Sequence, residues 1–175
     1  KKDLAKAGNE KRFAKDKKFW DDQLDALGEP LYSDIQGPSV LEEARKRHGN
    51  PKLRSSDIEM KDLFVAVKDY YLEPGPTKNL IDFCMNHQLS MTNLLLLGIR
   101  TYLSKVNNGQ EDITIQNFIS RRSTHDEWTS GGSRTIMFPC RTVIAPETDF
   151  LSAAYEIQNM QNRIYMHSNY DPAFI

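Results

Sequence analysis

The chain has 175 residues, enough for one domain with a buried core that needs neither disulfides nor a metal to fold. Its 23 basic and 24 acidic side chains give a formal net charge of -1, which leaves no bulk basicity to hold a nucleic-acid backbone. The longest apolar run, residues 94–99, is too short to cross a bilayer.

Two cysteines, Cys84 and Cys140, lie in apolar runs and have no second cysteine or histidine at metal-ligand spacing. They predict small buried thiols in a reducing compartment, so we expect a cytoplasmic protein. The first residue is Lys1, and the apolar ending DPAFI carries no stop pattern, so we also expect a piece of a longer protein.

The N-terminal segment predicts a helix over residues 1–27 that Gly28 ends. Apolar side chains recur there at spacings that share one helix face: Phe13, Trp20, Leu24 and Leu27. The lysines and aspartates between them indicate a solvated opposite face. Residues 29–56 carry several glycine and proline breaks and one helix-like run at 40–47, which is typical of a long connector.

A strand and two helices are predicted next. Alternating apolar residues indicate a strand over residues 63–72, and Pro-Gly-Pro then breaks the chain. Thr77 is placed to cap a helix over residues 77–87, and Ser90 opens a second helix in the same way. The second helix is apolar nearly all round at 94–99, so we expect it to be the buried centre of the fold.

The last part of the chain predicts two strands and a helix. The strands cover residues 113–120 and 134–144, and a polar loop joins them. The helix follows Thr148 and carries one stripe of mostly apolar residues, namely Phe150, Ala154, Ile157, Gln161 and Ile164. This order of elements predicts the α/β class, as a two-layer α/β sandwich with helices packed on one face of a mixed sheet.

The polar loop holds a serine, a histidine and an acid close together: Ser123, His125 and Asp126. A catalytic triad needs a base within hydrogen-bond reach of the nucleophile and a third group that orients the base. Near-adjacent residues do not define that triangle, and no Gly-x-Ser-x-Gly elbow accompanies them. The sequence therefore disfavours a triad here.

Metal and phosphate motifs are missing from the sequence. The four histidines are isolated, and none belongs to a His-x-x-x-His or Cys-x-x-Cys pair: His48, His87, His125 and His167. The pair Gly131-Gly132 permits close backbone approach to a ligand, and Arg122, Arg134 and Arg141 could clamp an anion. Without a Walker or Gly-x-Gly-x-x-Gly pattern, these residues alone indicate a turn and ordinary surface or interface arginines.

Four segments carry motifs in a distinctive order. The first, RFAKDKKFWDDQL at residues 12–24, has a lysine-aspartate pair, an aromatic-tryptophan pair and a leucine. The second, residues 80–123, contains a helix, a turn, a buried helix, a strand and then Arg122. The third, GSRTIMFPCRT at 132–142, connects a glycine to an arginine, and the fourth, YMHSNYDPAF, contains His167.

In this order the segments resemble the C-terminal half of the condensation domains of nonribosomal peptide synthetases, in the chloramphenicol-acetyltransferase-like superfamily of CoA-dependent acyltransferases. Gly132, Pro139 and Arg141 match the third motif of that family. Arg134 and Ile136 stand where the family usually has an aromatic residue and an asparagine. The resemblance implies one half of a two-lobed fold with the active-site tunnel between the lobes.

The resemblance also implies a division of the chain and a set of site residues. Residues 1–28 would be a helix at the junction with the N-terminal lobe, 29–56 a connector, and 57–175 the C-terminal condensation subdomain. The implied substrate-binding residues are Arg122, Gly132, Ile136 and Arg141, of which Arg141 is expected to be chiefly structural. No residue of this chain is expected to be catalytic or to bind a metal.

Condensation domains use a His-His-x-x-x-Asp-Gly motif in their N-terminal half, whose second histidine assists attack of an acceptor amine on a thioester. None of the four histidines here is doubled or followed by Asp-Gly at that distance. The resemblance therefore implies an inactive fragment whose partners are the N-terminal lobe and carrier-protein domains, with their phosphopantetheine arms as substrates. We expect no nucleic-acid or membrane partner, and self-association through an exposed apolar face.

Two other functions stay open at this point. One is a stand-alone acyltransferase that takes its acyl group from coenzyme A or a carrier protein. The other is a non-catalytic module that docks carrier proteins. Adenylation and carrier modules in the same polypeptide would favour the synthetase, whereas absence of the doubled histidine from the full-length protein would favour the docking module.

Overall fold

The computed structural model divides the chain into two compact units. Unit 1 comprises Lys1–Leu31, Thr114–Thr142 and Asn159–Ile175, and unit 2 comprises Tyr32–Ile113 and Val143–Gln158. The structure describes residues 10–25, 27–28, 30–31, 33–35, 37–53, 67–120, 122, 125–133, 135–171 and 175.

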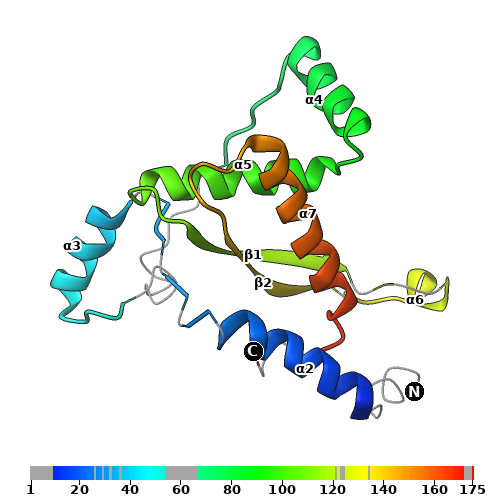
Figure 1. The fold of residues 1–175 in the computed structure, drawn as a ribbon, viewed down its shortest axis with the longest axis horizontal. Helices are drawn as coiled ribbons and strands as arrows, with labels where there is room; N and C mark the ends of the chain where they lie inside the picture. The colour runs from blue at the N-terminus through cyan, green and yellow to red at the C-terminus, as the bar shows by residue number, and fades with distance from the viewer. Residues whose placement is uncertain are drawn as a thin grey trace. The chain divides into compact units, whose positions relative to one another are not determined.

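The first described helix, α2, covers Glu10–Leu24 in unit 1 (Figure 1). Lysine–aspartate pairs at i, i+4 spacing line its exposed side. These are Lys17–Asp21 at 2.6 Å and Lys18–Asp22 at 2.8 Å. The helix prediction is confirmed over this range, but Leu27 lies beyond the helix and is exposed, because the chain turns at Gly28 with a φ of 72°.

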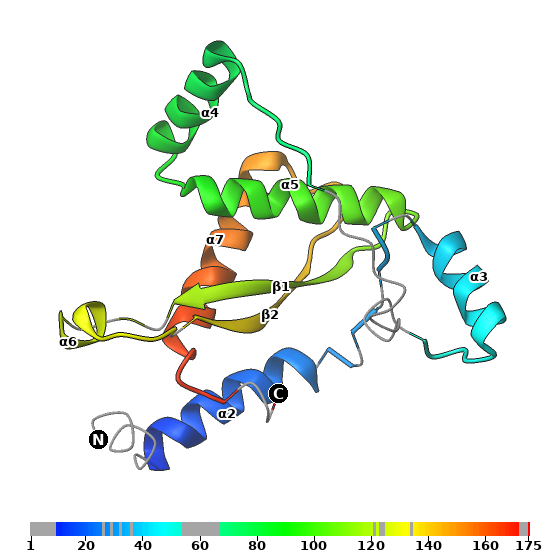
Figure 2. The ribbon, with the colours of Figure 1, turned by 180° about the vertical axis from the view of Figure 1, so that it is seen from behind.

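Two antiparallel strands form the sheet of the described residues, β1 at Asp112–Ser120 and β2 at Thr135–Val143 (Figure 2). Both predicted strands and the α/β class are confirmed. In unit 1, Ile119 and Phe138 are fully buried against helix residues, whereas Phe118 and Met137, which alternate with them, are exposed. Helices therefore cover one face of these strands.

The sequence predicted a mixed sheet with a further strand over residues 63–72. Residues 63–66 lie outside the described residues, and residues 67–73 have no regular structure. Tyr71 is 91% exposed, and the described sheet contains β1 and β2 alone. The strand prediction is wrong for the described part, because β-branched and aromatic residues form a strand only where a neighbouring strand pairs with them.

Unit 2 begins with two helices, α3 at Pro38–His48 and α4 at Pro74–Asn86. The first confirms the helix-like run within the predicted connector. The second begins earlier than the cap predicted at Thr77, because a proline at the first helical position needs no N–H donor and has a helical φ. The Thr77 hydroxyl instead donates to the Glu73 carbonyl at 2.9 Å within the first turn.

The third helix of unit 2, α5, covers Met91–Val106 and begins as predicted. The Ser90 hydroxyl accepts a hydrogen bond from the Asn93 amide at 3.1 Å, which caps the first turn. Leu97 is fully buried, whereas Leu95 and Ile99 are exposed. The prediction of a buried central helix is therefore right for one side of α5 and wrong for the other.

A buried arginine fixes α5 to the strand ends within unit 2. The Arg100 guanidinium donates to the Ile144 carbonyl at 3.1 Å and to the Glu111 carbonyl. Burial lowers the pKa of this guanidinium. Arg100 follows the apolar run 94–99, and a lone charge beside such a run is the sequence feature that indicates this role.

The last helix, α7, covers Phe150–Met166. The carboxylate of Asp149 accepts from the amides of Leu151 and Ser152 at 3.1 and 3.0 Å and caps the helix, and its bonds with Ser152 lower its pKa. The predicted stripe is buried at Ala154, Ile157, Gln161 and Ile164 but exposed at Phe150. No helix in the described ranges combines the length and apolarity needed to span a membrane.

Candidate functional site

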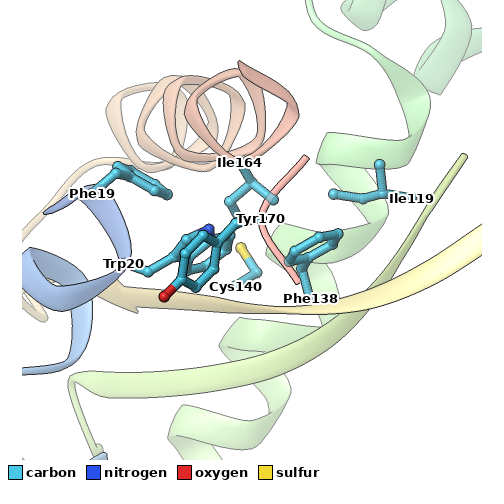
Figure 3. Close-up of a cluster of buried hydrophobic side chains, with 7 residues drawn as sticks. All are labelled: Phe19, Trp20, Ile119, Phe138, Cys140, Ile164 and Tyr170. Atoms are coloured by element: carbon cyan, nitrogen blue, oxygen red, sulfur yellow. The ribbon is translucent and has the colours of Figure 1, made fainter. Parts of the chain in front are cut away.

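Residues of the first, third and fourth sequence motifs lie together around α2 in unit 1. We call the four residues Asp16, Trp20, Arg141 and His167 the α2 junction. Trp20 stacks on Phe138 of β2, with ring centroids 5.3 Å apart and an interplanar angle of 11°. Figure 3 shows this ring among the buried side chains of the unit 1 core, which also includes residues of α2, β1 and α7.

A histidine–aspartate pair in the α2 junction joins α2 to the segment that follows α7. The Nδ1 atom of His167 lies 2.8 Å from Oδ1 of Asp16, and the imidazole stacks on Phe19 at 4.3 Å. The Trp20 indole N–H donates to the His167 carbonyl at 3.3 Å. The sequence positions of these residues are far apart, so the pair fixes the segment after α7 onto α2.

An imidazole oriented by a carboxylate is also half of a catalytic triad. The His167 side chain is only 12% exposed, and no described hydroxyl or thiol is hydrogen-bonded to its ring. The pair therefore lacks the nucleophile that a triad needs, within the described part of the chain. The pair is a buried polar contact that joins α2 to the segment after α7.

Arg141 binds the C-terminal end of α2. Its guanidinium donates from Nη1 to the carbonyls of Gly28 at 2.7 Å and Gln23 at 3.4 Å, and from Nη2 to that of Leu27 at 3.1 Å. Gln23 lies in the last turn of α2, where carbonyls have no partners within the helix and carry partial negative charge, and Leu27 and Gly28 lie in the turn that follows. Arg141, which is 3% exposed, supplies donors to both and places a positive charge at this end of α2.

The loop between the strands is organised by Arg122. We call the described residues of this loop, 122 and 125–133, the Arg122 loop. The guanidinium of Arg122 donates to the Ser130 carbonyl at 2.8 Å and to the carbonyls of Glu127 and Gly132. Gly132 adopts a φ of 86°, which favours glycine. The structure thus brings together two of the predicted site residues, Arg122 and Gly132.

The Arg122 loop contains a short helix, α6, at His125–Thr129, where the sequence predicted only an irregular polar loop. His125 and Asp126 lie on this helix and are exposed. Ser123 and Arg134 lie outside the described residues, so the disfavoured triad and the three arginines that could clamp an anion are only partly described.

A separate apolar groove lies within unit 2, between α4, α5 and the start of α7. Its volume is about 830 Å³, which is in the range of small-molecule pockets. Leu80, Phe83, Leu95, Ile99 and Phe150 are among the residues that line it, and no acid, base or nucleophile does. In the described part of the chain, no three His, Cys, Asp or Glu side chains gather in a way that could hold a metal ion.

Comparison with known proteins places these motifs in a family. A family model described as the condensation domain matches residues 2–173. The chain belongs to the condensation domain family. It is 22% identical over 160 residues to a plipastatin synthase polypeptide of Bacillus subtilis (strain 168). That alignment covers 91% of this chain and 5% of the relative, so the chain spans a small part of that relative's length, and no solved structure matches.

The predicted site residues of this condensation domain chain have different surroundings. Arg122 and Gly132 share the Arg122 loop, Arg141 lies in the α2 junction, and half-buried Ile136 packs against the unit 1 core. An asparagine at position 136 would place an amide against that apolar core, where it would need its own partners. The substrate contacts of all four residues stay predictions.

Sequence reasoning missed a buried polar network in unit 1. Gln161 of α7 accepts from the Asn117 side chain of β1 at 2.7 Å and donates to the Cys140 sulfur of β2 at 3.3 Å. Gln161 was predicted on the buried stripe of α7, and a glutamine on such a stripe is the feature that indicates a buried network. Both cysteines are buried free thiols, as predicted.

Replacing Arg122 with glutamine should loosen the Arg122 loop with little effect on global stability. The carbonyls of Glu127, Ser130 and Gly132 would lose their shared donor. Amide hydrogen exchange over residues 125–132 should accelerate about tenfold, the equivalent of one or two lost hydrogen bonds. Arg122→Lys, which has no planar fork, should recover only part of the protection. Unchanged exchange in the glutamine variant would contradict this role.

Alkaline pH should destabilise the fold through Cys140. Burial raises the pKa of this thiol from 9.0 to about 11. Between these values the unfolded chain loses the proton and the folded chain keeps it, so the free energy of unfolding falls as pH rises. The expected loss is about 2 kcal/mol. Urea unfolding at pH 8 and pH 11 measures it, and Cys140→Ala should show a shallower decline than the wild type.

Proposed function

We propose that this chain is the C-terminal part of a condensation domain in a nonribosomal peptide synthetase. The intact parent would join a carrier-bound acyl or peptidyl thioester to an amine. The observation that carries the proposal is the match of the condensation domain model to residues 2–173, nearly the whole chain. The similarity to the plipastatin synthase polypeptide supports the synthetase context.

The proposed reaction forms an amide. The acceptor nitrogen attacks the thioester carbonyl carbon, the C–N bond forms, the C–S bond breaks, and the proton lost by nitrogen ends on the released thiol. A general base within reach of the amine would lower the barrier. The doubled-histidine motif that supplies this base in the family is not among these 175 residues, so we place the base in the N-terminal lobe of the parent.

The contribution proposed for this chain is to build one wall of the substrate tunnel. Its polar motif residues engage one another and the backbone: Asp16 with His167, Arg141 with the end of α2, and Arg122 with its loop. Side chains held in this way keep a wall in one geometry, which holds two reacting groups in position. We propose that the Arg122 loop, through Gly132, and Ile136 border the tunnel, and that the carrier phosphopantetheine arms enter it as substrates.

The parent protein tests this proposal. Purified parent is incubated with an amine acceptor on one carrier protein and an acyl donor presented either on a carrier protein or on coenzyme A, and products are identified by mass spectrometry. Amide formed from the carrier-bound donor is the expected result. Product formed only from acyl-coenzyme A would favour a stand-alone acyltransferase, and carrier binding without product would favour a docking module.

A further inference from the structure

The C-terminal end of α3 carries an unusual concentration of positive charge. Its last turn contains Arg45, Lys46, Arg47 and His48. The last turns of α5 and α7 hold one basic residue each, and those of α2, α4 and α6 hold none. The helix dipole favours cations at every one of these ends. It therefore does not account for the excess on α3.

The turn after α3 adds a further cation and is held in place by hydrogen bonds. Gly49 adopts a left-handed conformation, and the Asn50 amide donates to the Arg45 carbonyl at 3.1 Å. Arg45 Nε donates to the Leu53 carbonyl at 3.1 Å, and Leu53 is buried. The chain thus folds back on the helix end and brings Lys52 to the same end of α3.

Three cations and one histidine remain exposed there: Lys46, Arg47, Lys52 and His48. We call them the α3 basic patch. Some lysines on other helices have acidic partners, as in Lys17–Asp21, Lys18–Asp22 and Lys78–Asp82. In the described structure, by contrast, no side chain of the α3 basic patch forms an ion pair, although Glu42 and Glu43 precede Lys46 and Arg47 by four residues. Like charges gathered at one helix end repel one another, and an acidic partner would relieve that repulsion.

The kind of partner follows from the surroundings of the patch. Nucleic-acid binding needs a longer basic track, commonly with stacked aromatic side chains, and the turn at 49–52 consists of Gly, Asn, Pro and Lys. A membrane surface would need apolar anchors beside the cations, and this turn has none. We infer that the α3 basic patch docks an acidic surface of another protein domain. This inference stands apart from the proposed amide-forming function.

Binding of the 175-residue chain to a short poly-L-glutamate tests the inference. The dissociation constant is measured by fluorescence anisotropy at low ionic strength, about 20 mM, where exposed charges are weakly screened. Lys46→Gln/Arg47→Gln should weaken binding about tenfold, and Lys52→Gln about threefold. Lys17→Gln/Lys18→Gln removes the same charge from lysines that already have partners and should change binding by less than about twofold.

Three results would overturn the inference. One is an equal loss of poly-L-glutamate affinity in Lys46→Gln/Arg47→Gln and in Lys17→Gln/Lys18→Gln. That result would show that binding responds to net charge alone. Another is the absence of binding to poly-L-glutamate by the wild-type chain. The third is tighter binding of a single-stranded oligonucleotide or of anionic lipid vesicles than of poly-L-glutamate, with loss of that binding in Lys46→Gln/Arg47→Gln. Circular dichroism confirms that each variant keeps its helices.

Discussion

Replacing Trp20 with alanine is expected to lower the free energy of unfolding by about 4 kcal/mol, in the range measured for large aromatic deletions in cores. The side chain is 2% exposed, stacks on Phe138 and donates to the His167 carbonyl. Its removal would open a cavity between α2 and β2 and leave that carbonyl with the Tyr170 amide, at 3.3 Å, as its remaining donor. Urea unfolding followed by circular dichroism measures the loss.

The chain offers a matched control for this substitution. It has two tryptophans, and the other, Trp128, is 67% exposed on α6. Trp128→Ala should change the free energy of unfolding by less than about 0.5 kcal/mol. Trp20→Phe, which keeps an aromatic ring but removes the N–H donor, should cost about 1.5 kcal/mol. Equal losses for the two alanine variants would contradict the role given to Trp20.

Replacing Arg141 with methionine should have the second-largest effect, a loss of about 3 kcal/mol. Methionine fills much of the same volume, so the loss reports the hydrogen bonds to the carbonyls of Gln23, Leu27 and Gly28 more than packing. Hydrogen bonds from a charged donor are each worth about 1.5–3 kcal/mol. Thermal or urea unfolding of the variant checks the value.

Two further variants separate charge from geometry at Arg141. Arg141→Lys keeps the charge but loses the planar fork that reaches several carbonyls, so it should retain only about half of the stabilisation. Arg47→Met makes the same chemical change at an exposed position and should alter stability by less than about 0.5 kcal/mol. Full stability in Arg141→Lys would show that charge at the end of α2 suffices.

Local patterns predicted most of the secondary structure because the forces that set it are local. The hydroxyl of Ser90 caps the very turn that follows it, and the apolar stripe of α7 is buried from Ala154 to Ile164. The start of α4 was misplaced because a proline was taken as a break, although it fits the first turn of a helix. The strand predicted over residues 63–72 failed in its described part because pairing is not local.

The site was harder to predict because its contacts join distant parts of the chain. The motif order identified Asp16 and His167 as parts of separate segments, and nothing in either segment indicates that they bind each other. Arg122 and Gly132 were both named from the resemblance, and the structure adds the reason for their proximity, which is a hydrogen bond across the Arg122 loop. Residues of the sequence motifs therefore form contacts that hold unit 1 together.

The proposed function assigns these 175 residues a positioning role in a condensation domain whose base lies elsewhere in the parent. Amide formation from a carrier-bound thioester donor and a carrier-bound amine acceptor tests that assignment, with the isolated chain and the parent assayed side by side. We expect amide product with the parent and none above background with residues 1–175 alone. Amide product formed by the isolated chain would show that the base lies within it and would refute the assignment.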